Sequence, residues 1–449
     1  MKIYMPIEVA SRELEARTLL AFFSARSSFD VVLGRKKELI DHALASEPGI
    51  FLSQWGLHRN FLPLYKKLKS KGHLIVCFDE EGLVTLAFDN YVKTKINENC
   101  VEIADKVLLW GRSQEQKFKA AFQSSSKKFK AVGNPRDDIL DAKFDSLFDL
   151  GKLNSISANS QAIVFVSSFG FANHAIGGEA YFENSIKNGV FFNEEVEAIF
   201  RDYFNFQEKN FAKFIDLVEV TARDYPEKII TYRCHPAENR ESLLQRFRGM
   251  NNVKFSYGGS IIPVLRDAEL VIHNYCHAGI EAQILGKKTF AMRPFRDPKI
   301  ENEQVYENSV SLSSVDEARK EINRFICSVS EKSNEINHEI SHDFLFSDGQ
   351  QLAVERFVDT FIELRSDLNF QRDAKIFSAN QYIDRLKRFL RKAKNSYIDQ
   401  KSEGLDFETV KKILDEIIKI YPDGRQELDF RQLKPFVFAL KSMSSKDNE

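Results

Sequence analysis

A short apolar run that ends at a sharp turn and continues as a helix occurs twice between residues 229 and 293. The first run, KIITY, is β-branched and uninterrupted, as is typical of a strand buried on both faces of a parallel sheet. It ends at His235-Pro236, where the proline lacks an amide donor and disfavours helical backbone at the histidine. The helical pattern ENRESLLQRF begins shortly afterwards. The sequence therefore predicts a strand, a sharp turn and a helix, with an imidazole at the carboxyl end of the strand.

In the second occurrence, LVIHN is predicted to be a strand, YCHAG a turn, IEAQILG a helix and KTFAMR the next strand. Ligands of open parallel sheets bind outside the carboxyl ends of the strands, and helix-start amides beside an imidazole suit a phosphate. We therefore predict that the two turns bind a nucleotide, with a carboxylate on its ribose hydroxyls. The alternative is that His235 and His273 are core histidines at strand ends, but the repetition of the pattern favours a ligand site.

Small and hydroxyl residues extend this nucleotide-binding prediction. The segment SSFGFANH begins where the apolar run AIVFV ends, and small side chains there allow a phosphate or sugar to approach the backbone. An ordinary loop explains the same segment equally well. The predicted nucleotide-binding residues are Arg233, His235, Pro236, Glu238, Asn239, Ser260, His273, Asn274, His277, Gly279, Glu281, Ser167 and Ser168.

Composition restricts the class of protein. A hydrophobic content of 43% with 39 phenylalanines can fill sizeable cores and argues against a disordered chain. The net charge of −1 gives no indication of nucleic-acid binding. The five cysteines show no CxxC spacing, which favours a reducing compartment without disulfides or a zinc site. We see neither a signal peptide nor a run of the ~18 apolar residues that a membrane span requires, so we expect a cytoplasmic protein.

The order of apolar runs and helical segments predicts two α/β units. Residues 1–150 contain six apolar runs separated by helical patterns, and this spacing predicts a parallel, doubly wound sheet. A Ser- and Asn-rich linker follows, and residues 160–345 repeat the pattern as a second Rossmann-like domain. Residues 346–376 are predicted to form a helical return segment, and residues 377–449 a helical appendage. Two such domains are expected to face each other across a ligand-binding cleft.

Three carboxylates directly follow one of the predicted strands. In CFDEEGL, the residues Asp79, Glu80 and Glu81 precede Gly82, which permits a tight turn. Clustered carboxylates at a strand end can raise one another's pKa and supply a general base. We predict that one of them, together with His235, acts in catalysis. A solvated acidic loop is the alternative.

Four further residues are candidates for binding a sugar or an acceptor. Arg12 and Glu13 follow the first strand, although a capped helix start explains Glu13 without any function. Arg136 closes the turn Gly-Asn-Pro-Arg and could bind an anion, and Asn173 lies in the SSFGFANH segment.

A basic amphipathic segment lies near the C-terminus. In YIDRLKRFLRKAK (382–394), apolar residues fall on one helical face and six basic residues occupy the rest. This pattern suits a helix lying on an anionic membrane surface. A solvated helix packed on its neighbour is the alternative.

Several of these segments together resemble one family. The GNPR turn, the RxHPxEN turn and the IHNxCxxGxEAxxxGK segment resemble bacterial surface-carbohydrate biosynthesis glycosyltransferases of GT-B fold. Related CMP-sugar enzymes, the sialyl-, polysialyl- and β-Kdo transferases, carry an HP motif that binds CMP, and some carry a D/E-D/E-G motif whose acid is a base. His235-Pro236 matches the first motif, and Glu80-Glu81-Gly82 matches the second. The chain departs from the family at His277-Ala278, where relatives often have Ser or Thr.

The resemblance implies transfer of a CMP-activated 2-keto sugar acid, Kdo or another nonulosonate, onto a surface polysaccharide or glycolipid. The partners would be this nucleotide-sugar donor and a glycan or lipid-linked glycan acceptor, with peripheral contact to the inner membrane. No metal or other cofactor is expected, because the leaving group is a monophosphate. The sugar carboxylate needs a cation or an amide as its partner, for which Arg12, Arg136 and Arg233 are candidates. Inversion by a base and retention through a carboxylate nucleophile both remain open.

Two other functions remain open at the level of sequence. One is a transferase that uses a CDP-activated polyol, glycerol or ribitol, in the synthesis of a capsule or cell-wall polymer. The other is a noncatalytic protein that binds a nucleotide sugar, which the presence of all three carboxylates disfavours.

Overall fold

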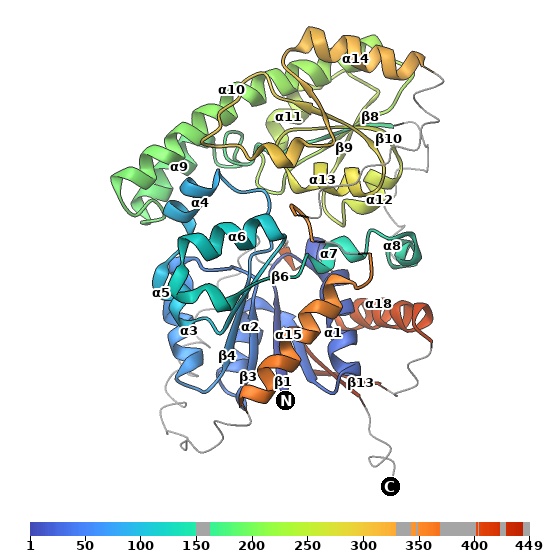
Figure 1. Ribbon diagram of the computed structural model, residues 1–449. Coiled ribbons are helices and arrows are strands. Elements are labelled where there is room, and N and C mark those ends of the chain that lie inside the picture. Colours follow the sequence, from blue (N-terminus) through green and yellow to red (C-terminus); the bar gives the residue numbers. More distant parts are fainter. Residues whose placement is uncertain are drawn as a thin grey trace.

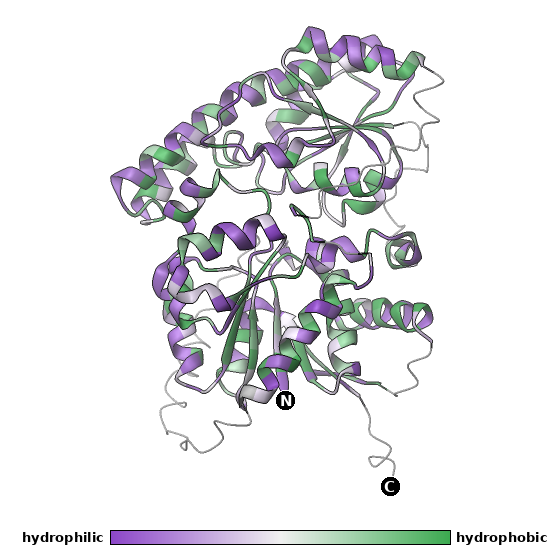
Figure 2. Ribbon diagram, viewed as in Figure 1, coloured by the Kyte–Doolittle hydropathy of each residue, from purple (hydrophilic) through white to green (hydrophobic). Residues whose placement is uncertain are grey.

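The computed structural model describes residues 1–149, 162–328, 343–346, 349–368, 401–402, 404–422 and 428–442. These residues form two α/β units, each built around one twisted sheet with helices packed on it (Figure 1). The apolar residues concentrate in the strands and on the helix faces turned toward them (Figure 2).

The first unit contains the N-terminal residues and the C-terminal segment. Its strands are β1 (Lys2–Ile7), β2 (Asp30–Arg35), β3 (Gly49–Ser53), β4 (Leu74–Phe78), β5 (Lys106–Leu109), β6 (Phe129–Ala131), β13 (Leu428–Lys434) and β14 (Val437–Ser442). Its helices are α1 (Ala10–Arg26), α2 (Lys36–Ala43), α3 (Leu62–Lys69), α4 (Phe88–Lys95), α5 (Glu98–Ile103), α6 (Arg112–Ala121), α7 (Pro135–Asp138), α8 (Ser146–Asp149), α15 (Ala353–Leu368) and α18 (Phe407–Ile420). The strand order is β13-β14-β2-β1-β3-β4-β5-β6. All neighbours from β2 to β6 are parallel.

The second unit is a sheet in which every pair of neighbouring strands is parallel. Its strands are β7 (Ala162–Val166), β8 (Ile230–Arg233), β9 (Val253–Ser256), β10 (Ala268–His273), β11 (Lys288–Met292) and β12 (Val310–Leu312). Its helices are α9 (Gly178–Lys187), α10 (Glu194–Asp224), α11 (Arg240–Arg246), α12 (Ile262–Arg266), α13 (His277–Ile284) and α14 (Val315–Cys327). The order β12-β11-β10-β7-β8-β9 reverses direction between β7 and β10, as in dinucleotide-binding domains.

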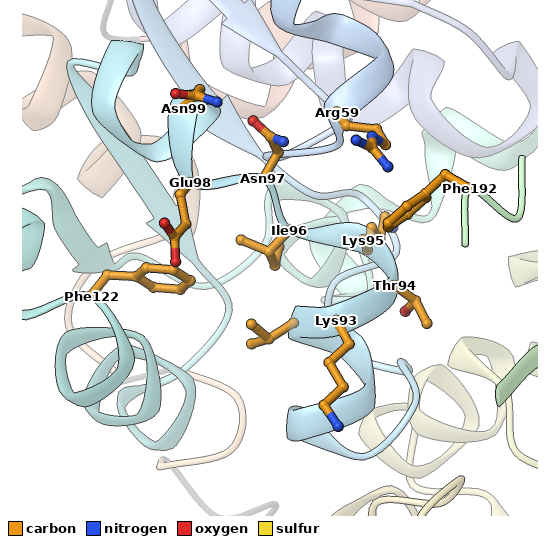
Figure 3. Close-up of a pocket in the computed structure, with 11 residues that line it drawn as sticks. Arg59, Lys93, Thr94, Lys95, Ile96, Asn97, Glu98, Asn99, Phe122 and Phe192 are labelled. Carbon is orange, nitrogen blue, oxygen red and sulfur yellow. The ribbon is translucent and has the colours of Figure 1, made fainter. Parts of the chain in front are cut away.

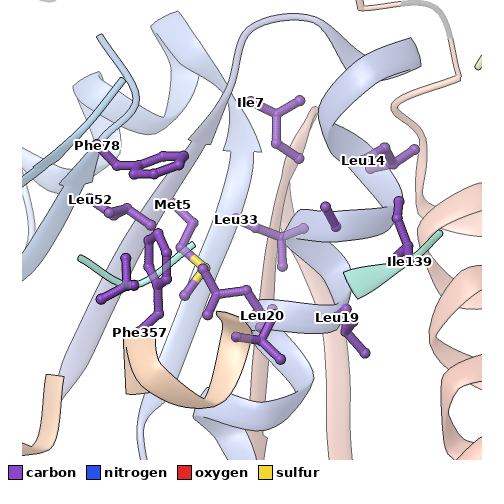
Figure 4. Close-up of a cluster of buried hydrophobic side chains, with 14 of the residues drawn as sticks. Met5, Ile7, Leu14, Leu19, Leu20, Leu33, Leu52, Phe78, Ile139 and Phe357 are labelled. Carbon is purple, nitrogen blue, oxygen red and sulfur yellow. The ribbon is translucent and has the colours of Figure 1, made fainter. Parts of the chain in front are cut away.

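Apolar side chains from distant parts of the sequence form the core of the first unit. Phe357 of α15 lies beside Leu52 and Phe78 of the sheet, and Leu14 and Leu20 of α1 pack nearby (Figure 4). Helix α15 therefore returns the chain from the second unit to the first and closes one face of the first sheet.

The predicted fold class is confirmed, because the described residues form two parallel, doubly wound α/β sheets. Each of the six apolar runs predicted in residues 1–150 forms a strand of the first sheet. The runs around residues 162, 230, 253, 270 and 288 form strands of the second sheet.

The C-terminal segment differs from the predicted helical appendage. After α18 it forms an antiparallel hairpin, β13 and β14, and β14 pairs antiparallel with β2. Val437, Phe438 and Leu440 of β14 are buried against the first unit. The reason is that this hairpin finds its partner strand near the N-terminus, so its short apolar run is stabilised by a distant contact that local periodicity does not reveal.

The predicted membrane-binding segment, 382–394, lies outside the described residues. Within the ranges given above, no helix combines the length and the apolar character that crossing a bilayer demands.

We expect Phe438→Ala to lower the free energy of unfolding by about 3–5 kcal/mol, the usual cost of deleting a buried phenylalanine ring. Phe438 is fully buried, and its ring lies 6.3 Å from Phe407 and 6.0 Å from Phe430. Urea unfolding of the full chain measures the change. Leu433→Ala on the same hairpin is the matched control, because Leu433 is 39% exposed and should change stability by less than about 0.5 kcal/mol. Similar small effects of both substitutions would mean that the hairpin is an independent appendage.

Candidate active site between the two sheets

The turns that follow β7, β8 and β10 meet at the strand-order reversal of the second sheet. Ser168, after β7, donates a hydrogen bond from its hydroxyl to the carbonyl oxygen of Asn274, after β10. Gln207 of α10 donates from its side-chain amide to the carbonyl oxygen of Ser168 at 3.1 Å. Ligands of such sheets bind in the crevice at this reversal. The fold therefore brings the predicted turns of residues 167–174, 233–239 and 273–281 to one place.

The His235-Pro236 turn is held in one conformation by Glu238. The backbone N–H of His235 donates to one carboxylate oxygen of Glu238 at 2.7 Å, and the Ser167 hydroxyl donates to the other at 2.7 Å. Nδ1 of His235 accepts from the backbone N–H of Ala237 at 3.2 Å. Because Nδ1 is an acceptor, a neutral imidazole carries its proton on Nε2. The ring therefore offers an N–H donor on the side away from its own turn.

A glycine that the sequence analysis missed permits this ring position. A Cβ added at Gly170 would lie 2.2 Å from Nδ1 of His235, closer than any real contact. A side chain at residue 170 would displace the imidazole or the turn. No local signal identifies Gly170, since the contact is with a residue far along the chain.

Charges from the first unit act on His235. Part of His235 is exposed to solvent, but many protein atoms pack around it. The resulting loss of hydration lowers the pKa of His235 to about 4. The negative charge of Glu81 raises this pKa, and the positive charge of Arg12 lowers it. The two motifs predicted from sequence, one on each unit, are therefore close enough to influence each other electrostatically.

The three carboxylates after β4 have different surroundings. Asp79 accepts from the Tyr91 hydroxyl at 2.8 Å and pairs with Lys95 at 2.6 Å. Glu80 is buried and forms an ion pair with the buried Arg17. The side chain of Glu81 is 58% exposed. Of the three, only Glu81 is open to a substrate.

Arg12 controls the charge of Glu81. The two side chains form an ion pair at 2.6 Å, and the Arg12 guanidinium holds the pKa of Glu81 well below its usual range. Glu13 is buried and accepts from the backbone N–H groups of Glu8 and Val9, which orders the start of α1. Glu13 also binds Arg12 at 3.2 Å. Its position therefore supports a helix-start role that orients Arg12, in place of the predicted sugar contact.

His277 lies at the boundary between the units. Its Nε2 accepts from the backbone N–H of Val84 at 3.4 Å, and its ring centroid is 5.4 Å from that of Trp110. Burial lowers the pKa of His277 to about 3, so the ring is neutral. This neutral imidazole thus lies against the residues that follow the carboxylate turn of the other unit.

An ion pair joins two of the predicted residues across the same boundary. Arg136, after β6, binds Glu281 of α13 at 2.6 Å, and both side chains are largely buried. The second carboxylate oxygen of Glu281 is buried without a hydrogen-bond partner among the described residues. One carboxylate oxygen of Asp137 is likewise buried without a partner among these residues, and burial raises the pKa of Asp137. Arg136 and Glu281, predicted to contact different parts of a ligand, neutralise each other here.

Several predicted ligand contacts are buried parts of the turns. His273 is fully buried, with Nε2 2.8 Å from the Ser309 hydroxyl, and a Cβ on Gly279 would lie 2.4 Å from its Nδ1. For His273 the alternative interpretation, a core histidine, agrees with its burial. Asn274 is also buried and donates to the carbonyl oxygen of Met292 at 2.7 Å. These side chains pack beneath the turns that form the site and are not exposed at its surface.

Other predicted residues order the neighbouring loops. Asn239 caps α11 by accepting from the backbone N–H of Ser242 at 3.2 Å, and its own N–H donates to the carbonyl oxygen of Asn173. Arg233 donates to the carbonyl oxygens of Gly258 and Gly259, at 2.7 Å each. It therefore fixes the loop that ends at Ser260, which is half-buried.

Helix α1 contributes a titratable residue that the sequence analysis missed. Burial raises the pKa of Glu15 to about 7, and the charge of Arg136 opposes this shift. Glu15 follows Arg12 by one helical turn, so both fall on the same face of α1. That spacing is the signal from which Glu15 could have been found. Across the described ranges, no cluster of three His, Cys, Asp or Glu side chains could hold a metal ion.

No protein-family model matches this sequence, and no curated protein matches it significantly. Solved structures do match the fold. A putative UDP-N-acetylglucosamine 2-epimerase from Listeria monocytogenes superposes with a TM-score of 0.53 at 13% identity, covering 84% of this chain and 99% of the other. A UDP-GlcNAc 2-epimerase from Neisseria meningitidis bound to UDP-GlcNAc superposes with a TM-score of 0.51 at 11% identity, covering 81% of this chain and 100% of the other. An S. aureus MnaA–UDP co-structure superposes with a TM-score of 0.51 at 12% identity, covering 84% of this chain and 100% of the other. The chain thus has a GT-B-like fold.

We expect the stability contributed by His273 to depend on pH. Desolvation lowers its folded-state pKa to about 4, whereas an unfolded histidine has a pKa of about 6.5. Between these values the unfolded state binds a proton that the folded state does not, so this stability is complete above about pH 6.5 and is lost as the pH falls toward 4. The free energy of unfolding of the wild type, minus that of His273→Gln, should fall by about 2 kcal/mol between pH 7 and 4.5. A pH-independent difference in urea unfolding would contradict the buried, neutral imidazole.

Proposed function

We propose that this chain is a glycosyltransferase that moves a CMP-activated 2-keto sugar acid, Kdo or another nonulosonate, onto a glycan or lipid-linked glycan. The observation that carries the proposal is the placement of the two motifs on either side of the boundary between the units, which His277 bridges by accepting from the Val84 N–H just after the carboxylate turn. His235-Pro236 lies on one side, and Glu81 with its partner Arg12 lies on the other, close enough to act on the pKa of His235. The GT-B-like fold supports an enzyme that uses a nucleotide sugar, and the motifs support the CMP donor.

On the donor side, His235 is suited to the phosphate of CMP. Its neutral ring directs an Nε2–H donor away from the turn, since Nδ1 is already occupied by the N–H of Ala237. A bound phosphate would favour the imidazolium form, because its negative charge raises the pKa of the ring. The departing CMP then receives a charge-assisted hydrogen bond as negative charge develops on its phosphate.

On the acceptor side, Arg12 provides a way to activate Glu81. The donor sugar carries its own carboxylate, which can replace Glu81 as the partner of Arg12. Once that happens, Glu81 loses the cation that lowers its pKa and becomes a stronger base. The acceptor hydroxyl would attack the anomeric carbon, the bond from this carbon to the phosphate oxygen would break, and Glu81 would take the hydroxyl proton. In the alternative retaining route, the Glu81 carboxylate would attack the anomeric carbon as its bond to the CMP phosphate oxygen breaks, and the acceptor hydroxyl would then displace Glu81 and lose its proton.

We expect His235→Ala to weaken CMP binding by about 10- to 100-fold, the usual value of one hydrogen bond to a charged group. Isothermal titration with CMP measures the effect, and CDP and UDP serve as competing nucleotides. Gly170→Ala should have a similar effect without removing the imidazole, because its Cβ displaces the ring. His235 is exposed, so His235→Ala should unfold at the same temperature as the wild type. Equal CMP affinity in all three proteins would refute the donor assignment, and tighter binding of UDP would favour a UDP-sugar reaction.

We expect Glu81→Gln to bind CMP normally and to lose about 10²- to 10⁴-fold in turnover, the range for removal of an acid–base group. Release of CMP from CMP-Kdo or CMP-sialic acid, with CDP-glycerol as the competing donor, provides the assay. Glu80→Gln is the matched comparison, since it leaves the buried Arg17 without its partner and should mainly lower stability. Normal turnover in Glu81→Gln would exclude Glu81 as base or nucleophile. Exclusive turnover of CDP-glycerol would assign the chain to the polyol transferases.

A further inference from the structure

A cavity of about 370 Å³ lies beside the carboxylate turn, at the boundary between the two units. The first unit supplies most of its wall, from the turn before α3 and from α4 and α5, and the second unit supplies Phe192 (Figure 3). Its lining residues are Arg59, Val92, Lys93, Thr94, Lys95, Ile96, Asn97, Glu98, Asn99, Phe122 and Phe192. The volume falls in the range of small-molecule sites, about 300–1,000 Å³. None of the predicted site residues lines it.

Arg59 is the distinctive group of this cavity. Its guanidinium carbon lies 3.7 Å from the centroid of the Phe192 ring, and Phe192 is 37% exposed. Where the structure describes the chain, the guanidinium makes neither a hydrogen bond nor an ion pair with a carboxylate. Stacking on an aromatic face leaves the edge of the guanidinium free for a carboxylate or phosphate, which it can bind with two parallel hydrogen bonds.

The other two cations of the wall are already paired with carboxylates, which sets Arg59 apart. Lys93 already pairs with Glu195 at 2.8 Å, and Lys95 pairs with Asp79 at 2.6 Å. Glu98 is the single carboxylate among the lining residues. The side-chain oxygen of Asn97 accepts from the N–H of Cys100, which leaves its amide N–H groups available as donors. Among the lining cations, Arg59 is thus the one for which the described residues provide no carboxylate partner, while Phe192 and Phe122 offer apolar surface.

Lys95 connects this cavity with the proposed chemistry. It lines the cavity and binds Asp79, which begins the turn that carries Glu81. Although burial lowers the pKa of Lys95, the charges of Asp79 and Glu81 together raise it above its usual value. A ligand in the cavity is thus adjacent to the turn on which the transfer reaction is proposed to occur.

We propose that this cavity binds an anionic glycan, with a carboxylate or phosphate on Arg59 and the C–H face of a sugar ring against Phe192. Treating this glycan as the acceptor rests on the proposed function, but the binding site itself does not. Because Arg59 and Phe192 come from different units, the complete site exists only when the units are in contact.

Binding of defined oligosaccharides to the full chain tests the site. The probes are a trimer of galacturonic acid, which carries carboxylates, maltotriose phosphorylated at a 6-hydroxyl, and neutral maltotriose. We expect at least one anionic trisaccharide to bind about 10-fold or more tightly than maltotriose at low salt, and the advantage to shrink at high salt. Which of the two binds more tightly separates carboxylate from phosphate recognition. Equal affinities for all three would overturn the proposal.

Substitutions locate the binding. Arg59→Ala should abolish the preference for the anionic sugar, and Phe192→Ala should weaken binding of all three sugars. Arg223→Ala is the matched control, because Arg223 is an exposed arginine on α10 outside the cavity, and it should bind like the wild type. Arg59→Lys retains the charge but cannot form two parallel hydrogen bonds, so intermediate affinity is expected. An Arg59→Ala protein that keeps the full preference would place the anion elsewhere and overturn the proposal.

A kinetic experiment separates this inference from the proposed function. With a CMP-sugar donor, Arg59→Ala should raise the KM for an anionic acceptor about 10-fold and leave the KM for the donor unchanged. If CMP does not bind but Arg59-dependent sugar binding persists, the donor assignment fails and the glycan site stands. If CMP binds and turns over but Arg59→Ala changes neither sugar affinity nor acceptor KM, the glycan site fails and the proposed function stands.

Discussion

Buried charges at the boundary between the two sheets must be paired, and this requirement organises the site. An isolated ion taken out of water is costly, whereas a paired one is tolerated. Arg17 therefore lies against Glu80, and Arg136 of the first unit lies against Glu281 of the second. These pairings leave Glu81, with Arg12, as the only carboxylate of its turn that solvent and a substrate can reach. The position of Glu81, the proposed base or nucleophile, thus follows from the ion pairs that its neighbours form.

Two histidines near strand ends of the second sheet differ in their position along the chain. His273 is the last residue of β10 and is level with Arg233, the last residue of β8, whereas His235 lies two residues beyond β8. The ring of each histidine packs against a glycine, Gly170 for His235 and Gly279 for His273. The proline after His235 prevents the helix from starting at once, so the ring emerges beside the boundary. His273 still belongs to the strand, and its ring is fully covered before the chain reaches α13 at His277. One imidazole is available to a ligand, and the other packs the turn.

The sequence was sufficient for those parts of the structure that depend on local periodicity. The apolar runs of both sheets, the turn at His235-Pro236 and the carboxylate turn were predicted because each has its signal within a few residues. The C-terminal hairpin was not, since β14 is held by β2 from the opposite end of the chain. Gly170 and the Arg59–Phe192 contact were missed for the same reason, because each has meaning only through a distant partner. The predicted roles of Asp79 and Glu80 could not be separated from that of Glu81 without knowing Lys95 and Arg17 as their partners.

The internal ion pairs also determine what a ligand must do in order to bind. Desolvation by the surrounding protein lowers the pKa of His235 and of His277, and Arg12 lowers the pKa of Glu81, so the imidazoles are neutral and the carboxylate is ionised and paired. In the proposed reaction, an anionic donor would displace Glu81 from Arg12, and the displaced carboxylate would then have a higher pKa beside the acceptor. Donor binding and activation of the base would therefore occur in the same exchange of ion-pair partners. An uncharged sugar, which cannot compete for Arg12, would leave Glu81 paired and a weak base, so under the proposed mechanism the contact with Arg12 would both orient the donor and select it by charge.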